Sequence, residues 1–136
     1  MKVLDVGTGT AVLAIASAKL GAEKIIAIDN DKWCYENSTE NCEVNLVNEK
    51  VDIRLCEIEE VAERDFDLVV ANIQRDILMQ IKKELHKRIK KNGILILSGL
   101  LISDKEAMQH EYENLNFRLL DSAESDEWIS LLFQLD

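Results

Sequence analysis

Short apolar segments alternate with amphipathic segments along most of the chain. The apolar segments are rich in valine, isoleucine and leucine, whereas the segments between them follow the helical period. The predicted strands are Lys2–Val6, Lys24–Ile28, Val51–Leu55, Asp67–Ala71 and Gly93–Ser98, and the predicted helices are Thr10–Leu20, Asp31–Val47, Arg75 to about Lys91, and Ser103 to about Asn114. Strands this apolar are typical of a parallel sheet that helices cover on both faces. The pattern therefore predicts a doubly wound α/β fold.

Local signals predict where several of these helices begin and end. Gly21 follows the first helix, and we expect it to adopt the left-handed conformation of a C-cap. Asn92-Gly93 is expected to do the same after Lys91. Ser103 and Glu106 have the spacing of a capping box, which predicts the start of the last helix.

The last part of the chain changes rhythm. Phe117–Leu120 and Trp128–Leu135 have strand-like patterns, and the short polar stretch Ser122–Asp126 separates them. Two strands joined in this way predict an antiparallel hairpin, which is an unusual end for a dinucleotide-binding sheet. The full prediction is a mostly parallel, seven-stranded sheet with an antiparallel C-terminal hairpin, formed by one domain over residues 1–136.

Composition supports a single compact domain. The chain has 136 residues, of which 47% are hydrophobic, and it contains no proline and no low-complexity stretch that would indicate a linker. No apolar run is long enough to cross a bilayer, and the N-terminus lacks the pattern of an export signal. We therefore expect a soluble cytoplasmic protein without a membrane partner.

The charge balance disfavours nucleic acid as a partner. Sixteen basic against 26 acidic residues give a net charge of -10, which repels a phosphate backbone and suits a basic or amine-bearing protein substrate. A basic series late in the third predicted helix is expected to be a solvated face, because no aromatic residues alternate with it. This series is Lys82, Lys83, Lys87, Arg88, Lys90 and Lys91.

The cysteines and tryptophans are interpreted as structural. Cys34, Cys42 and Cys56 form no close pair, and neither histidine completes a metal site with them, so we expect reduced thiols on the core or helix faces and no metal. Trp33 and Trp128 lie in apolar-periodic segments, which predicts core or edge packing.

A glycine-containing loop follows the first strand. In Asp5-Val6-Gly7-Thr8-Gly9-Thr10, two glycines stand where the backbone must turn and let a ligand approach. A nicotinamide-binding loop would have a third glycine at Val12 and would rarely carry a carboxylate such as Asp5. An acidic residue suits S-adenosylmethionine, which has a positively charged sulfonium and no pyrophosphate. The alternative is that the glycines only permit tight strand-to-helix packing.

Two further strand ends supply candidate cofactor contacts. Asp29 ends the second strand, beside the first strand in a doubly wound sheet, and its carboxylate can accept hydrogen bonds from both hydroxyls of a ribose. The alternative is that Asp29 caps the next helix, a role that Asn30 or Asp31 can also fill. At the third strand's end, Cys56 and Glu57 are expected beside the adenine.

Asn72 is the candidate catalytic residue. It follows the fourth strand at the same edge of the sheet, and its side chain can orient an attacking amine or hold the cofactor's methionine end. Methyl transfer needs little acid–base chemistry, so positioning is expected to supply most of the rate. The alternative is that Asn72 caps the helix that begins near Arg75. Asp76 is the other carboxylate near this edge, and a first-turn helix position explains it more simply.

These motifs resemble the bacterial ribosomal protein methyltransferases of the PrmA type, and the resemblance covers nearly the whole chain. The matching segments are Val3–Thr10, Leu13–Ala16, Leu20–Ala22, Ala27–Asp31, Val70–Ile73, Ile96–Leu101 and Glu127-Trp128. The glycine loop is shared by all class I methyltransferases, whereas Ala71-Asn72-Ile73 is more specific to this family. The resemblance implies transfer of methyl groups from S-adenosylmethionine to amino groups of a ribosomal large-subunit protein.

The resemblance also implies a set of cofactor contacts, with some departures. Gly7, Asp29 and Asn72 match the family's cofactor-binding positions; Thr8, Gly9, Thr10, Asn30, Cys56 and Glu57 complete the predicted site with Asp5. Ala11 stands where the family usually has glycine, and Asn30 replaces an apolar residue. The family carries an N-terminal recognition domain that these residues do not match. A small-molecule methyltransferase and a non-catalytic cofactor-binding module therefore remain alternatives.

Overall fold

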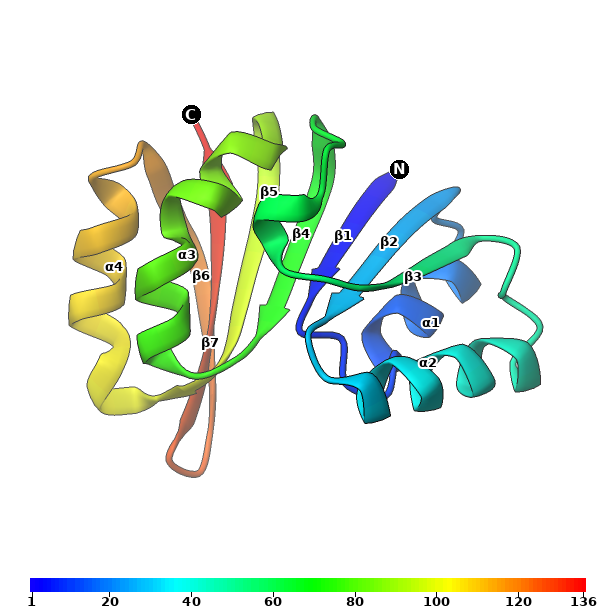
Figure 1. The fold of residues 1–136 in the computed structure, drawn as a ribbon. Helices are drawn as coiled ribbons and strands as arrows, with labels where there is room; N and C mark the ends of the chain where they lie inside the picture. Colours follow the sequence, from blue (N-terminus) through cyan, green and yellow to red (C-terminus); the bar gives the residue numbers. More distant parts are fainter.

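The computed structural model describes residues 1–136 as one seven-stranded sheet with the strand order β3-β2-β1-β4-β5-β7-β6 (Figure 1). The strands are β1 (Lys2–Val6), β2 (Lys24–Asp29), β3 (Val51–Leu55), β4 (Phe66–Asn72), β5 (Ile89–Leu101), β6 (Phe117–Ser125) and β7 (Trp128–Leu135). β1 to β5 pair in parallel, whereas β7 is antiparallel to both β5 and β6. The predicted fold class, including the C-terminal hairpin, is confirmed.

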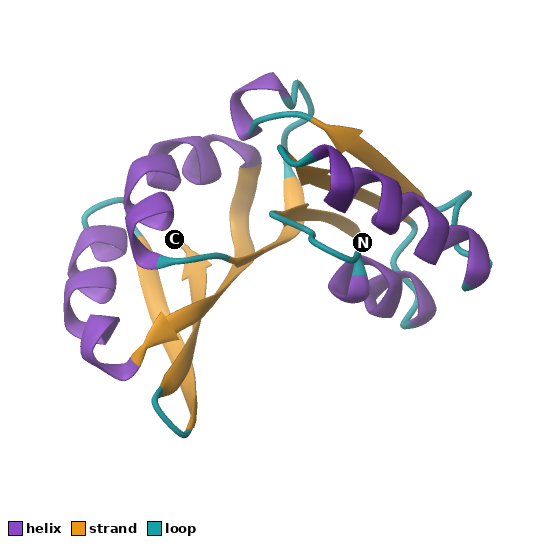
Figure 2. Cartoon of the chain, turned by 60° about the horizontal axis from the view of Figure 1, so that its bottom comes forward, coloured by secondary structure: helices purple, strands orange, loops and turns teal.

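Helices cover both faces of this sheet. They are α1 (Val12–Lys19), α2 (Lys32–Val44), α3 (Arg75–Arg88) and α4 (Lys105–Glu113), and the short 3-10 turns η1 (Ile58–Glu60) and η2 (Ile102–Asp104) lie between elements. Figure 2 shows α1 and α2 beside one half of the sheet, and α3 and α4 beside the other half. No helix has both the length and the apolar character needed to span a membrane.

Alternate side chains of the strands belong to two separate cores. Val3 of β1 packs in a small cluster with Ala14 of α1 and Cys42 of α2, whereas the next residue, Leu4, packs in a larger cluster that includes Leu78 of α3. Successive side chains in a strand point to opposite faces, so a central strand must be apolar at every position. The two cores thus explain why the predicted strands are hydrophobic at successive positions.

The third helix is shorter than predicted. It ends at Arg88, and the chain becomes extended at Ile89, which is buried and pairs with Phe66 at the start of β4. Asn92 does adopt a left-handed conformation, with φ 67°, but it lies in an irregular part of β5 and caps no helix. Burial of the Ile89 side chain thus outweighs the helix-terminating signal further along.

The capping box predicted at Ser103 is not formed. The side chain of Asp104 takes a different role, because its Oδ2 accepts a hydrogen bond from the backbone N–H of Leu101 at 3.0 Å. This contact closes the turn η2, and α4 begins only at Lys105. The predicted left-handed conformation of Gly21 is confirmed, with φ 104°.

The C-terminal hairpin is longer than predicted. β6 continues to Ser125, so that the polar residues Ser122–Ser125 pair with β7 and the turn consists of Asp126 and Glu127 alone. Polar residues form a strand here because this end of the hairpin extends beyond the packed core into solvent, as Figure 1 shows.

The structural interpretation of the cysteines is confirmed, whereas a core position for the tryptophans is contradicted. All three cysteines are free; Cys42 is buried and the other two are half-buried. Trp33, in the first turn of α2, is 69% exposed, and Trp128, at the start of β7, is 49% exposed. Neither indole is therefore a core residue.

Candidate functional site

A cleft opens at the carboxyl ends of β1, β2 and β3. It is lined by Val6, Gly7, Ile28, Asp29, Asn30, Cys56, Glu57, Ile58, Ile73, Ile77 and Ile81. Five of these residues were predicted from the sequence as cofactor contacts, and the parallel topology brings them together because the carboxyl ends of neighbouring strands meet at one edge. The cleft contains two carboxylates and no lysine or arginine.

The glycine loop needs its glycines for conformation and for space. Gly7 and Gly9 have φ 72° and 62°, in the left-handed region that side chains disfavour. A Cβ atom on Gly7 would lie 3.2 Å from Cγ2 of Ile73, which also lines the cleft. The backbone N–H groups of Gly7 and Thr8 donate to the carbonyl of Ile28, at 3.0 and 2.9 Å, and hold the loop against β2.

Asp29 connects the loop to the second strand. Its Oδ2 accepts a hydrogen bond from the backbone N–H of Gly9, and its Oδ1 accepts one from the backbone N–H of Asp31, both at 3.0 Å. The helix-capping role falls to Asp31, whose Oδ1 accepts from the N–H groups of Trp33 and Cys34. The alternative interpretation of Asp29 as the cap of α2 is therefore wrong, and its carboxylate is held in place facing the cleft.

Asp5 lies beneath the loop and does not line the cleft. Its side chain is 1% exposed, and its Oδ2 accepts a hydrogen bond from the hydroxyl of Thr8 at 2.7 Å. Burial raises the pKa of Asp5 from 3.8 to about 6; the Thr8 hydrogen bond lowers it and the nearby charge of Asp29 raises it. Asp5 and Thr8 thus support the loop from below. Thr10 contributes its carbonyl, which accepts from the side-chain amide of Asn41.

The rest of the cleft lining combines one polar pair with an apolar wall. The side-chain amide of Asn30 donates to Oε1 of Glu57 at 3.1 Å, joining the ends of β2 and β3. Ile73, Ile77 and Ile81 form the apolar wall, which sequence reasoning missed. Ile77 and Ile81 lie on one face of α3 because they are four residues apart, and this spacing is the signal that would have found them; Ile73 precedes the helix.

Arg88 holds the segment that carries Glu57 and Ile58. Its side chain is 5% exposed, and its guanidinium donates to the carbonyls of Val61 and Glu59, at 3.0 and 3.3 Å, and to the carboxylate of Glu84 at 2.6 Å. The prediction that Arg88 belongs to a solvated basic face is therefore wrong. Elsewhere in that series, Lys82 forms an ion pair with Glu111 of α4.

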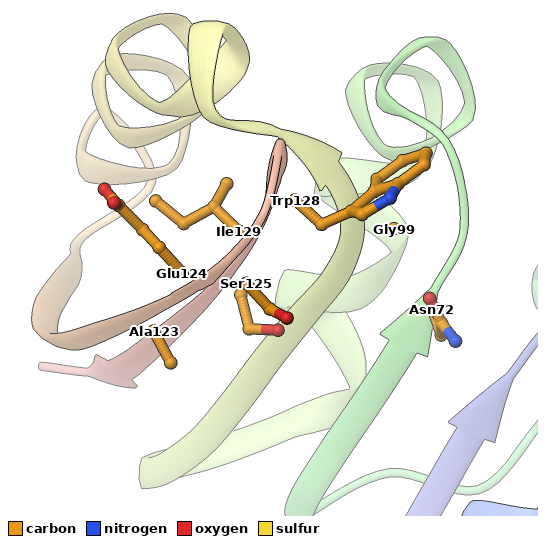
Figure 3. A pocket seen from close by; sticks show the side chains of 8 residues that line it. Asn72, Gly99, Ala123, Glu124, Ser125, Trp128 and Ile129 are labelled. Carbon is orange, nitrogen blue, oxygen red and sulfur yellow. The ribbon is translucent and has the colours of Figure 1, made fainter.

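A second hollow, of about 440 Å³, lies beside Asn72 at the end of β4 (Figure 3). Its other lining residues are Gly99, Ala123, Glu124, Ser125, Trp128, Ile129 and Ser130. The hollow lies where the pairing of β5 with β7 is irregular between Leu97 and Leu100, and bulges of this kind occur next to active sites. The hydroxyl of the lining residue Ser130 lies 3.2 Å from that of Ser98.

Asn72 itself lines this hollow and caps no helix. The N-cap position of α3 is Gln74, without a side-chain hydrogen bond, so the capping alternative is not supported. Asp76 lies in the exposed first turn of α3 and does not line this hollow, as the simpler interpretation expects. Asn72 therefore stands between the cleft at the glycine loop and the hollow beside the hairpin.

Comparison with known proteins identifies close relatives. Residues 1–136 match the family model described as "Ribosomal protein L11 methyltransferase (PrmA)". A ribosomal protein L11 methyltransferase of Thermosipho melanesiensis is 37% identical over 134 residues, which are 98% of this chain and 49% of that protein. The enzyme of the same name from Porphyromonas gingivalis is 36% identical over 137 residues, 100% of this chain and 47% of that protein. The chain thus spans about half the length of these relatives.

Solved structures give the same fold. The crystal structure of a ribosomal protein L11 methylase from Lactobacillus delbrueckii subsp. bulgaricus superposes with a TM-score of 0.92 at 28% identity, covering 97% of this chain and 68% of that one. An S-adenosylmethionine-dependent O-methyltransferase from Thermotoga maritima superposes with a TM-score of 0.84 at 14% identity, covering 98% and 58%; this likeness concerns the fold alone.

Proposed function

The chain belongs to the PrmA family of ribosomal protein L11 methyltransferases, and from that membership and the geometry of the cleft we propose that it binds S-adenosylmethionine and transfers methyl groups to amino groups of a ribosomal large-subunit protein. The proposed site of this chemistry is the cleft at the glycine loop together with the hollow beside Asn72. Such a substrate would place the activity in the cytoplasm.

The charge of the cleft is the observation that carries the proposal. Asp29 and Glu57 line it, Asp5 lies beneath the loop, and no lysine or arginine is present. A dinucleotide would bring two phosphates into this acidic environment, at a large electrostatic cost. S-adenosylmethionine has no phosphate and carries a positive sulfonium, so its charge complements the cleft.

The lining residues also match the parts of this cofactor. The carboxylate of Asp29 faces the cleft and is fixed by two backbone N–H groups, which leaves acceptor capacity for ribose hydroxyls. The isoleucine wall formed by Ile73, Ile77 and Ile81, together with the Asn30–Glu57 pair, suits an aromatic base with polar edges. Cys56 belongs to this proposed base-binding part of the cleft.

Asn72 is the proposed positioning group for the acceptor. When bound, the cofactor supplies a methyl group attached to a positively charged sulfur. The Oδ1 of Asn72 can accept a hydrogen bond from the acceptor amine, so that the nitrogen lone pair points toward the cleft. With the cofactor bound, the amine held by Asn72 would accept the methyl group, the electron pair of the broken carbon–sulfur bond would stay on sulfur, and the surplus ammonium proton would leave to water.

The net charge of -10 supports a basic protein as the acceptor, and it disfavours nucleic acid. A small-molecule acceptor is the enzymatic alternative. Incubation of the chain with S-adenosylmethionine labelled in its methyl group, and with either purified ribosomal protein L11 or a protein-free metabolite fraction, separates the two. We expect label on L11, at lysine or the α-amine. Label on metabolites alone would overturn the choice of substrate, and cofactor binding without any transfer would favour a non-catalytic module.

A further inference from the structure

Trp128 is half-exposed and lines the hollow beside Asn72, which is called the acceptor hollow below because the acceptor amine is proposed to bind there. It is the first residue after the hairpin turn, and it pairs with Leu101 of β5 and Ser125 of β6. Figure 3 shows the indole lying beside Gly99, near Asn72 at the tip of β4, while the carboxylate of Glu124 points away from Asn72. About half of the Trp128 surface is exposed to solvent, although burying this apolar surface would bring a large gain in free energy. Packing within the fold therefore does not account for its position.

A third hollow, of about 320 Å³, adjoins the hollow beside Asn72. Trp128 and Gly99 line both hollows, and the third hollow adds Gln74, Arg75, Asp76, Leu101 and Asp104. Trp128 thus lies where the two hollows meet, one of which contains Asn72. Whatever occupies the acceptor hollow is therefore close to the third hollow as well.

The third hollow offers both hydrogen-bond donors and acceptors next to apolar surface. The guanidinium of Arg75 is 47% exposed and makes one contact, from NH1 to Oδ1 of Asp104 at 3.3 Å, which leaves most of its five N–H donors available. Asp76 is exposed and forms no ion pair. Leu101 is 41% exposed and continues the apolar surface of the indole.

We propose that the two hollows form one polypeptide-binding groove divided by Trp128: the acceptor side chain enters the hollow beside Asn72, and the peptide backbone next to it binds between Arg75 and Asp76. This inference rests on the proposed function and adds a subsite to it. Peptide groups present alternating C=O and N–H groups, which match the donors of Arg75 and the acceptors of Asp76. A free small amine would fill the acceptor hollow alone.

The chain contains two tryptophans, so each can be observed separately by fluorescence. Trp33→Phe leaves Trp128 as the only indole, and Trp128→Phe leaves Trp33, which lines none of the three hollows. The probes are N-acetyl-lysine methylamide and a nonapeptide with one central lysine, each added with S-adenosylhomocysteine so that no transfer occurs. We expect both probes to change Trp128 emission in Trp33→Phe, and neither to change Trp33 emission in Trp128→Phe.

The subsite is tested by the difference between the probes. We expect the nonapeptide to bind about tenfold more tightly than N-acetyl-lysine methylamide, and Arg75→Ala in the Trp33→Phe background to remove most of that advantage without weakening the small probe. Asp76→Asn, which breaks no ion pair, is expected to act in the same direction. Equal affinity for the two probes, or equal losses for both in the variants, would overturn the subsite. Unchanged Trp128 emission would overturn the whole groove, whereas failure of the proposed function is seen separately as absence of methyl transfer by the unmodified chain.

Discussion

A Cβ atom on Gly99 would lie 2.9 Å from Oδ1 of Asn72 and 3.2 Å from both the backbone N and the carbonyl O of Ile73. Gly99 also has φ +76°, and it occupies the irregular stretch where β5 separates from β7. The absent side chain thus leaves the space in which the amide of Asn72 lies. Gly99 is therefore a positioning residue for the proposed acceptor site.

Gly99→Ala is expected to destabilise the fold by about 1–2 kcal/mol, through strain at positive φ, and also to lower the turnover of methyl transfer by about tenfold or more, because Asn72 must move. The matched control is Gly21→Ala, where φ is +104° and no atom lies within 4 Å of the added Cβ. This control should lose similar stability in thermal unfolding and keep its turnover. Equal turnover losses in both variants would contradict a positioning role for Gly99.

Asn72→Ala tests the acceptor contact itself. Turnover should fall by about tenfold or more, while the free energy of unfolding changes by less than about 1 kcal/mol, because Asn72 is exposed and caps no helix. The control is Asn48→Ala, which removes the side-chain amide of another exposed residue that lines none of the three hollows, and it should leave turnover unchanged. If Asn72→Ala retains the turnover of the unmodified chain, the residue has no part in orienting the acceptor.

Asp5 should make stability depend on pH. Its pKa is raised to about 6 in the fold, above the ordinary value of 3.8, so the folded state binds the proton more tightly than the unfolded state. Its contribution is therefore fully present below about pH 4 and is lost as the pH rises through about 6, a change of about 3 kcal/mol.

Asp5→Asn isolates this effect from that of the other carboxylates. The amide cannot ionise, and its oxygen can still accept the hydrogen bond from Thr8. In urea titrations the variant should match the unmodified chain near pH 4 and exceed its stability by up to about 3 kcal/mol near pH 7. A difference between the two proteins that does not vary with pH would show that Asp5 is not the titrating group.

Arg88→Ala is expected to destabilise the fold by about 3 kcal/mol, because it leaves the buried carbonyl of Val61 and the buried end of the Glu84 carboxylate without their donor and removes the hydrogen bond to the carbonyl of Glu59. Lys87→Ala is the control, since the neighbouring Lys87 side chain is half-exposed and pairs only with Glu84. The free energy of unfolding of Lys87→Ala, measured with urea, should differ from that of the unmodified chain by less than about 0.5 kcal/mol. Comparable effects of the two substitutions would argue against Arg88 as the anchor of η1.

The fold could be predicted in outline because its strands are apolar on both faces and its helices are periodic. The boundaries that differ have two causes. α3 ends at Arg88 because Ile89 pairs with Phe66, a contact between distant residues that no local pattern contains. η2 forms because Asp104 binds the backbone of Leu101, a local contact that competes with the capping box expected at Ser103.

The candidate site was predictable to the extent that it lies on strand ends. Gly7, Asp29 and Glu57 follow strands, and parallel topology brings strand ends together. The exposed indole of Trp128 was not predictable, because its place at the edge of the groove depends on the irregular pairing of β5 with β7. The same irregularity gives Gly99 its role.

Calorimetric titration with S-adenosylmethionine tests the central claim most directly. The unmodified chain should bind one equivalent, and Asp29→Ala should weaken that binding by about 1–3 kcal/mol through loss of charge-assisted hydrogen bonds. Glu40→Ala, which removes the same charge from an exposed position on α2, should bind as the unmodified chain does. Absence of binding heat with the unmodified chain, or equal affinity in Asp29→Ala, would contradict the assignment of the cleft to this cofactor.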